Sequence, residues 1–285
     1  MMRTVYVNGE FLPETEAKIS IFDRSFLFAD GVYEVTSVLD GKLIDFMGHM
    51  KRLERSLKEL KFDFKPDIDQ LLEAHRELVK LNDITEGLIY LQVSRGSAGD
   101  RDFAISKTTP PTIVMFTQSK SLINSPLAER GQKIMTFPDI RWRRSDIKTV
   151  QLLYASLLKT DVAAQGKDDA WMVLDGFITE GSSNNAYIVT KDGTIVTREL
   201  STDILHGITR ASVLKCAEEL QLKVEERQFT VEEAQNAAEA FSTSASAFVC
   251  PVVEIDDKPI GDGVPGPVAK RLREIYIEAN RKMAI

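Results

Sequence analysis

A lysine, a carboxylate and a glycine-containing turn stand at three separated places in the second half of the chain. They are Lys148, Glu180 and Gly207. An amine, an acid and a turn that presents N–H groups can hold a ligand with an aldehyde, a ring nitrogen and a phosphate. Pyridoxal phosphate carries all three groups, so the spacing suggests one divided site for this cofactor.

Lys148 is the candidate amine. A lysine that forms a Schiff base must lose its proton near neutral pH, and burial or a neighbouring cation favours that loss. Lys148 lies between Ile147 and Thr149, with Arg143 and Arg144 close in sequence. Taken alone it also has the plainer interpretation of a solvated structural lysine, because lysines are mostly exposed.

Glu180 is the candidate carboxylate. It ends an apolar, strand-like stretch and precedes the turn-rich run Gly-Ser-Ser-Asn-Asn. A carboxylate that accepts a hydrogen bond from a pyridinium N–H makes the ring a better electron sink. The alternative is an acidic residue that caps a turn.

Two small turns are candidates for phosphate contacts. The first begins at Gly207 and enters a helix predicted from Thr209 to Leu220, and helix N-termini present unpaired N–H groups to anions. The second, over 242–246, is rich in hydroxyl groups. A connection with Thr209 as the helix N-cap would need no phosphate, so the turn alone leaves both interpretations open.

The composition indicates a globular protein. Of 285 residues, 43% are hydrophobic and 28% are charged, and the net charge of -7 disfavours a general nucleic-acid surface. No segment has the ~18 consecutive apolar residues of a membrane helix, and the first residues do not resemble a signal peptide. Only Cys216 and Cys250 are present, which favours a reducing compartment and gives no metal-binding pattern. We expect a cytoplasmic protein without membrane or nucleic-acid partners.

The first half of the chain alternates strand-like and helix-like stretches. Asn8-Gly9 and Asp40-Gly41 separate apolar β-formers and predict hairpin turns. Apolar residues recur at three- and four-residue spacing over 50–60 and 68–79, which predicts two helices. The predicted strands are Thr4–Val7, Glu10–Leu12, Tyr33–Val38, Lys42–Phe46, Leu88–Val93 and Thr112–Phe116.

The second half predicts hairpins followed by helices. Strands are expected over Trp171–Leu174, Phe177–Glu180 and Asn185–Thr190, and helices over Val150–Ala164, Thr209–Leu220, Thr230–Ala238 and Val268–Arg281. The stretch between the halves is polar, contains one proline and lacks periodicity. We therefore expect an N-terminal α/β domain over 1–118, a linker over 119–131 and a C-terminal cofactor-binding domain over 132–285.

Six motifs in this order resemble the fold-type IV pyridoxal phosphate enzymes, which include D-amino acid, branched-chain and (R)-amine aminotransferases and aminodeoxychorismate lyase. They are Phe22–Arg24, Phe28–Val35, His49–Leu53, Ile140–Lys148, Thr179–Asn184 and Gly207–Arg210. The resemblance covers nearly the whole chain. It implies an α+β fold with two domains, a smaller N-terminal α/β domain and a larger C-terminal domain with a curved or barrel-like sheet and helices.

The resemblance assigns cofactor roles position by position. Lys148 matches the Schiff-base lysine, which also moves a proton between Cα and the cofactor C4′, and Glu180 matches the partner of the pyridine nitrogen. Arg52 matches the arginine that clamps the phosphate, for which a guanidinium fork is well suited. The other expected cofactor contacts are Ser183, Leu205 against the ring, Gly207, Ile208 and Thr209 at the helix start, and Ser244 and Ala245 in the second turn.

The stretch from Phe28 to Val35 looks most like D-amino acid aminotransferases, in which the tyrosine at the position of Tyr33 helps to hold the substrate carboxylate. Val35 is expected in the same substrate site. These enzymes also use an Arg-x-His pair lent by the neighbouring subunit. Arg101 matches the arginine, but Phe103 replaces the histidine. The resemblance therefore implies a homodimer that exchanges amino groups between D-alanine or D-glutamate and an α-keto acid in two half-reactions.

A second departure leaves alternatives open. Ser37 stands where the D-amino acid enzymes often carry a lysine, and fewer polar groups loosen discrimination for the α-carboxylate. An (R)-amine or branched-chain aminotransferase and a lyase such as aminodeoxychorismate lyase are the alternatives on the same scaffold. A non-enzymatic binding protein would need neither Lys148 nor Glu180.

Overall fold

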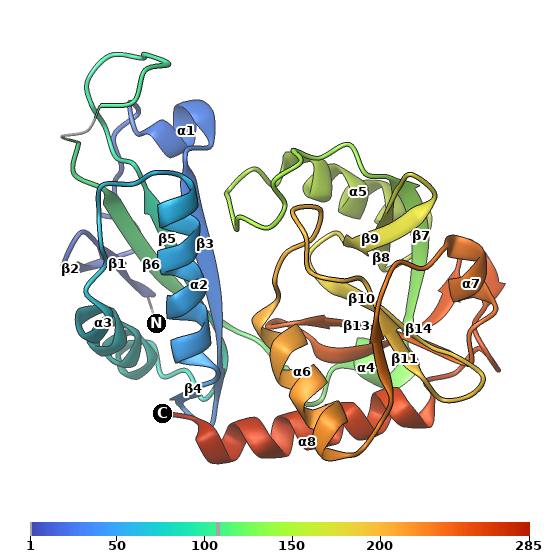
Figure 1. Ribbon diagram of the computed structural model, residues 1–285. Coiled ribbons are helices and arrows are strands. Elements are labelled where there is room, and N and C mark those ends of the chain that lie inside the picture. The colour runs from blue at the N-terminus through green and yellow to red at the C-terminus, as the bar shows by residue number, and fades with distance from the viewer. Residues whose placement is uncertain (1, 107–108) are drawn as a thin grey trace. The chain divides into compact units, whose positions relative to one another are not determined.

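The computed structural model describes residues 2–106 and 109–285, which divide into two compact units (Figure 1). Unit 1 comprises Met1–Ser121, Ile147–Gln151 and Met283–Ile285, and unit 2 comprises Leu122–Asp146 and Leu152–Lys282. Unit 1 therefore takes in a short segment from the middle of the chain, and that segment contains Lys148. The proposed division at 118 and 132 remains a prediction.

Unit 1 is built on an antiparallel sheet, six-stranded in the described residues, with the order β2-β1-β6-β5-β3-β4. Its strands are β1 (Thr4–Val7), β2 (Glu10–Pro13), β3 (Gly31–Leu39), β4 (Lys42–Leu43), β5 (Glu86–Ser94) and β6 (Thr112–Ser119). Its helices are α1 (Arg24–Phe28), α2 (Phe46–Glu59) and α3 (Ile68–Leu81).

The alternation of side chains along β3 separates two faces of this sheet. Val32 and Val38 join the core that α2 and α3 cover, and residues of β5 such as Leu91 belong to the same core. Tyr33 and Val35 are half-buried and lie on the opposite face. The period of two thus directs the predicted substrate residues away from the helices.

Both predicted hairpin turns of unit 1 are confirmed, and Asn8 and Asp40 have positive φ as such turns require. The strand predicted up to Phe46 is wrong at its end. Asp45 has a φ of 53° and turns the chain, so that Phe46 begins α2 and buries its ring in the core beneath that helix.

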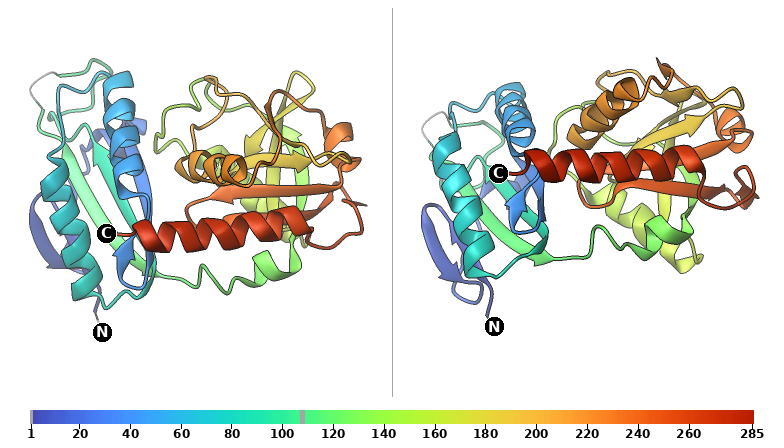
Figure 2. Two further views of the ribbon diagram at one scale, coloured as in Figure 1. Left: turned by 60° about the horizontal axis from the view of Figure 1, so that its bottom comes forward. Right: turned by 90° about the horizontal axis from the view of Figure 1, so that it is seen from below.

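Unit 2 is built on a mixed, curled sheet that has nine strands in the described residues, ordered β12-β11-β10-β13-β14-β7-β8-β9, with β15 beside β14 (Figures 1 and 2). Its strands are β7 (Gln132–Pro138), β8 (Asp169–Leu174), β9 (Phe177–Gly181), β10 (Asn185–Val189), β11 (Ile195–Thr197), β12 (Val224–Glu226), β13 (Glu239–Ser244), β14 (Phe248–Ile255) and β15 (Lys258–Pro259). Its helices are α4 (Pro126–Arg130), α5 (Leu153–Ala164), α6 (Ile208–Glu219), α7 (Val231–Gln235) and α8 (Pro267–Met283).

The predicted helices of this half exist, with shifted ends. Helix α5 begins at Leu153 rather than Val150, because the residues before it pair with β3 and are extended. Helix α6 begins at Ile208, so Gly207 rather than Thr209 is its N-cap. The predicted cap of α7 is confirmed: the Thr230 side chain accepts a hydrogen bond from a backbone N–H, although that helix ends at Gln235.

Among residues 2–106 and 109–285, no helix combines the length and the apolar character that crossing a membrane requires. In the same residues no three His, Cys, Asp or Glu side chains gather as ligands for a metal ion.

Candidate active site

Backbone pairing with β3 fixes the position of Lys148 within unit 1. The Tyr33 N–H donates to the Lys148 carbonyl at 3.0 Å, and the Val150 N–H donates to the Gly31 carbonyl at 3.1 Å. These bonds flank an antiparallel bridge between Val32 and residue 149. The segment therefore acts as a short additional edge on β3, and its backbone is held as firmly as a strand.

The side chain of Lys148 lies over an aromatic ring. Its ammonium nitrogen is 4.1 Å from the centroid of the Tyr33 ring, which attracts a cation through its negative face. Tyr33 stacks on Tyr90 at 5.5 Å, and Tyr90 stacks on Phe116 at 4.8 Å. Two predicted site residues, Lys148 and Tyr33, are thus brought together on one face of the sheet.

Arg52 is held by a buried carboxylate on the other face of β3. Its Nε donates to Glu34 Oε1 at 2.8 Å and its Nη2 donates to Glu34 Oε2 at 2.6 Å. His49 Nδ1 is 2.8 Å from the same Oε2. The fork of two parallel bonds fixes both the position and the plane of the guanidinium group.

The charge of Glu34 depends on these partners. Burial raises the pKa of a carboxyl group, but the charge and hydrogen bonds of Arg52, with those of His49, outweigh it and lower the pKa of Glu34 to about 2. A buried carboxylate without such partners would take up a proton instead. The three side chains therefore form one unit in which Glu34 stays ionised.

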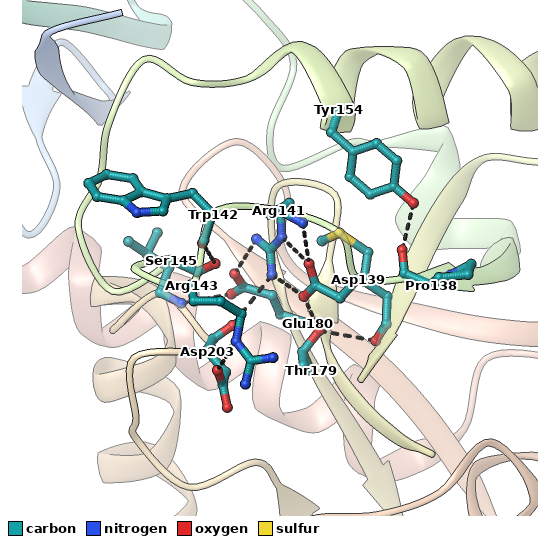
Figure 3. A network of polar contacts seen from close by, with 12 residues as sticks. Pro138, Asp139, Arg141, Trp142, Arg143, Ser145, Tyr154, Thr179, Glu180 and Asp203 are labelled. Carbon is teal, nitrogen blue, oxygen red and sulfur yellow. Dashed lines mark hydrogen bonds and ion pairs between the residues drawn. The ribbon is translucent and has the colours of Figure 1, made fainter. Parts of the chain in front are cut away.

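In unit 2, Glu180 is the centre of a polar network (Figure 3). Arg141 Nη1 donates to Glu180 Oε1 at 2.7 Å, while its Nε and Nη2 donate to the two carboxylate oxygens of Asp139 at 2.9 and 2.7 Å. The Thr179 hydroxyl also donates to Asp139, at 2.8 Å. Burial raises the pKa of Glu180, and the charge of Arg141 opposes that rise.

Asn185 connects Glu180 to the turn before α6. The Asn185 Nδ2 donates to Glu180 Oε2 at 3.0 Å and to the Leu205 carbonyl at 2.9 Å, and the Leu205 N–H donates to the same Oε2 at 3.0 Å. Gly207 is required next to it, because a Cβ there would lie 2.1 Å from Asn185 Oδ1. The carboxylate and the start of α6 therefore keep a fixed geometry.

The start of α6 suits an anion. Its N-cap, Gly207, has no side chain that could occupy the first N–H groups, and these include those of Ile208 and Thr209. An amine on an aromatic ring, a buried carboxylate and an uncapped helix start are the donor set that pyridoxal phosphate needs. The residues of the two units fit this cofactor by their chemistry.

The remaining predicted contacts lie near these groups in sequence. Ser183 is exposed in the turn between β9 and β10. Ser244 ends β13 and Ala245 begins the turn into β14, both half-buried. Their contacts with a cofactor stay a prediction.

Arg101 lies apart from Lys148 in sequence but within the same unit. Its guanidinium carbon is 5.0 Å from the centroid of the Phe28 ring and 4.8 Å from that of Phe103. It also lines a cavity of about 300 Å³ with Arg24 and Asp102. The phenylalanine at the expected histidine position therefore contacts the arginine directly.

The sequence analysis missed the residues that hold the predicted ones. Glu34, His49, Arg141, Asp139 and Asn185 all lie within motifs that were singled out or directly beside them. Their residue types carried no signal, because a buried ion pair and an exposed one look alike in a single sequence.

The class IV amino-transferase family model matches residues 31–255 of this chain. The chain belongs to the class IV aminotransferases. It is 38% identical to a D-alanine aminotransferase of Staphylococcus aureus (strain MSSA476), over 98% of this chain and 99% of that one. It is 38% identical to a D-alanine aminotransferase of Bacillus licheniformis, over 94% of each chain.

Solved structures of the same class are similar as well. A branched-chain amino acid aminotransferase from T.th., with pyridoxamine 5'-phosphate, gives a TM-score of 0.89 at 29% identity, over 98% of this chain and 94% of that one. The enzyme of Thermoproteus uzoniensis with norvaline gives 0.87 at 25% identity, with the same coverage. The predicted α+β fold of type IV and the cofactor, pyridoxal phosphate, are confirmed for this class IV aminotransferase.

The buried pair of Glu34 and Arg52 predicts a pH-dependent stability. Because the pKa of Glu34 in the folded protein, about 2, lies below its ordinary value of 4.5, this group stabilises the fold above pH 4.5. The stabilisation, about 3 kcal/mol, is lost as the pH falls from there through about 2. The free energy of unfolding of wild type and Glu34→Gln should therefore differ most near neutral pH and converge in acid.

Urea denaturation at a series of pH values measures this difference. Glu73→Gln, at an exposed position of α3, is the matched control and should stay within about 0.5 kcal/mol of the wild type. A constant gap between wild type and Glu34→Gln down to about pH 2.5 would contradict the ionised pair.

Proposed function

We propose that this chain is a D-amino acid aminotransferase, which transfers the amino group of D-alanine or D-glutamate to an α-keto acid. The observation that carries the proposal is the 38% identity to D-alanine aminotransferases along almost the full length of both chains. The retained Lys148, Tyr33 and Glu180, in the environments described above, support it. Bound pyridoxal phosphate would supply an aldehyde that exchanges amines and a ring that accepts electrons.

Lys148 would take the proton from the Cα of the amino donor and deliver it to the opposite end of the same three-atom system. Its backbone cannot shift, because it pairs with β3 on both sides of residue 149. Its nitrogen, over the Tyr33 ring, keeps a defined side of approach. A fixed face of proton transfer is what makes the reaction specific for one enantiomer.

Glu180 would accept a hydrogen bond from the protonated ring nitrogen. A buried carboxylate serves this purpose only while it is charged, and burial raises its pKa. The 2.7 Å contact with Arg141 and the two N–H donors on Oε2 favour the charged form. Arg141 therefore supports the ring partner in this proposal.

Arg52 and the start of α6 would hold the phosphate, with Ser183, Ser244 and Ala245 as further contacts and Leu205 against the ring. Glu34 holds Arg52 in one orientation, which reduces the cost of ordering it around an anion. The order of the motifs along the chain supports the assignment of both groups to one cofactor. We further propose a cytoplasmic homodimer with the active site at the subunit interface.

Arg101 would bind the α-carboxylate of the substrate, with Tyr33 and Val35 beside the substrate as well. A guanidinium group forms the paired hydrogen bonds that a carboxylate accepts. The second candidate is a branched-chain aminotransferase, which the similarity to solved enzymes of that kind favours. Loss of the histidine at position 103 also favours a broader donor range.

A panel of amino donors separates these functions. The holoenzyme with 2-oxoglutarate and D-alanine should release pyruvate and D-glutamate, and should do so at least about tenfold faster than it converts L-leucine or (R)-1-phenylethylamine. Coupled assays and chiral chromatography measure the products. Faster turnover of L-leucine would favour the branched-chain alternative, and pyruvate formed without an acceptor would indicate a lyase.

Replacement of Arg101 tests the carboxylate contact. Arg101→Ala should raise the KM for D-alanine by about tenfold to a hundredfold, because a charge-assisted hydrogen bond to a carboxylate contributes about 1.5–3 kcal/mol. The kcat should fall much less, since the arginine does not reach the reacting bonds in this proposal. Steady-state kinetics decide the matter, and an unchanged KM would remove Arg101 from the substrate site.

A further inference from the structure

The segment that carries Arg101 is held by a second arginine, Arg24 of α1. Arg24 Nη1 donates to the Asp102 carbonyl at 2.6 Å, and longer contacts of 3.5 Å reach the carbonyls of Phe103 and Ala104. The Arg24 side chain is 8% exposed, so these bonds are shielded from water. One buried guanidinium group therefore holds the backbone directly after Arg101.

Arg24 is itself fixed by Asp30. Its Nε donates to Asp30 Oδ2 at 2.8 Å, and Arg95 Nε donates to the same oxygen at 2.8 Å. Arg95 continues to the Leu60 carbonyl at 2.7 Å and lies 3.9 Å over the Phe62 ring. Both arginines are thus anchored to a part of unit 1 that does not belong to the Arg101 segment.

An aromatic ring joins Arg24 to Arg101. The centroid of the Phe28 ring is 4.5 Å from the Arg24 guanidinium carbon and 5.0 Å from that of Arg101. Phe28 also contacts the Phe103 ring at a centroid distance of 5.3 Å. The two rings and the two arginines form one cluster beside the cavity that Arg101 lines.

We propose that Arg24 is a positioning residue for Arg101, and that through it the chain selects amino donors with an α-carboxylate. The inference rests on the proposed role of Arg101 in substrate binding. Arg24 fixes the backbone at 102–104, while Phe28 and Phe103 fix the guanidinium stem. An aromatic side chain at 103 then fits this function without a polar contact, because it restricts the arginine rather than binding the carboxylate.

The structure offers a closely matched control. Arg3 also pairs with a carboxylate, Glu14, donates to a backbone carbonyl, that of Thr117, and lies over the Phe116 ring at 5.4 Å. It holds none of the residues around Arg101. Arg3→Met therefore removes the same kinds of contact from unit 1 without releasing the Arg101 segment.

The test compares Arg24→Met, Arg24→Lys, Arg3→Met and Arg101→Ala as holoenzymes. Arg24→Lys keeps the charge near Asp30, but an ammonium group lacks the fork that reaches a carboxylate and a carbonyl together. This variant keeps the question open to experiment if Arg24→Met does not fold. Stopped-flow absorbance of the half-reaction over a range of D-alanine concentrations gives the Kd and the limiting rate, and hydrogen exchange of residues 97–106 reports on the segment directly.

Both Arg24 variants should raise the Kd for D-alanine about tenfold and change the limiting rate by less than about threefold. Exchange in 97–106 should become faster in these variants and stay unchanged in Arg3→Met. A normal Kd in the Arg24 variants, when Arg101→Ala has raised it, would overturn the inference alone. A normal Kd in Arg101→Ala would instead refute the carboxylate role of Arg101, and the inference with it, even if exchange becomes faster in the Arg24 variants.

Discussion

The pairing of residues 147–151 with the edge of β3 is the constraint on which the site in unit 1 depends. A lysine in a free loop would lose side-chain and backbone entropy at every turnover, whereas two backbone hydrogen bonds already hold Lys148 here. The same strand also directs Tyr33 toward the amine and Glu34 toward α2. The alternation of one strand therefore sets the positions of an amine, its aromatic support and a buried ion pair.

Charged groups in both units are stabilised by the same principle. Glu34 and Glu180 are almost completely buried, and each would be costly as an isolated anion. Each one faces an arginine and at least one further N–H group. The outcomes differ, because the pKa of Glu34 is lowered and that of Glu180 is raised. The first pair keeps an arginine in place, and the second leaves a carboxylate whose charge a ring N–H can further stabilise.

Local patterns in the sequence predicted much of the fold. The Asn8-Gly9 turn and the cap at Thr230 depend on neighbouring residues only, and both were predicted correctly. Helix α5 began later than predicted because the residues before it pair with a strand more than a hundred positions away. Propensity and periodicity contain no information about such long-range pairing. The strands β7, β13 and β14, which lie inside the sheet of unit 2, were missed for a related reason. Continuous apolar runs there lack the alternation of a half-exposed strand.

The site could be predicted as a list of residues but not as a set of contacts. Motif order identified Lys148, Glu180 and Arg52, whereas the partners that hold them, Glu34 and Arg141, became visible only from distances. The central claim is that Lys148 is the amine that binds pyridoxal phosphate. Borohydride reduction of the holoenzyme, followed by digestion and mass spectrometry, tests it directly. The account predicts the added mass of the reduced cofactor on the peptide that contains Lys148, and that mass on a different lysine would contradict it.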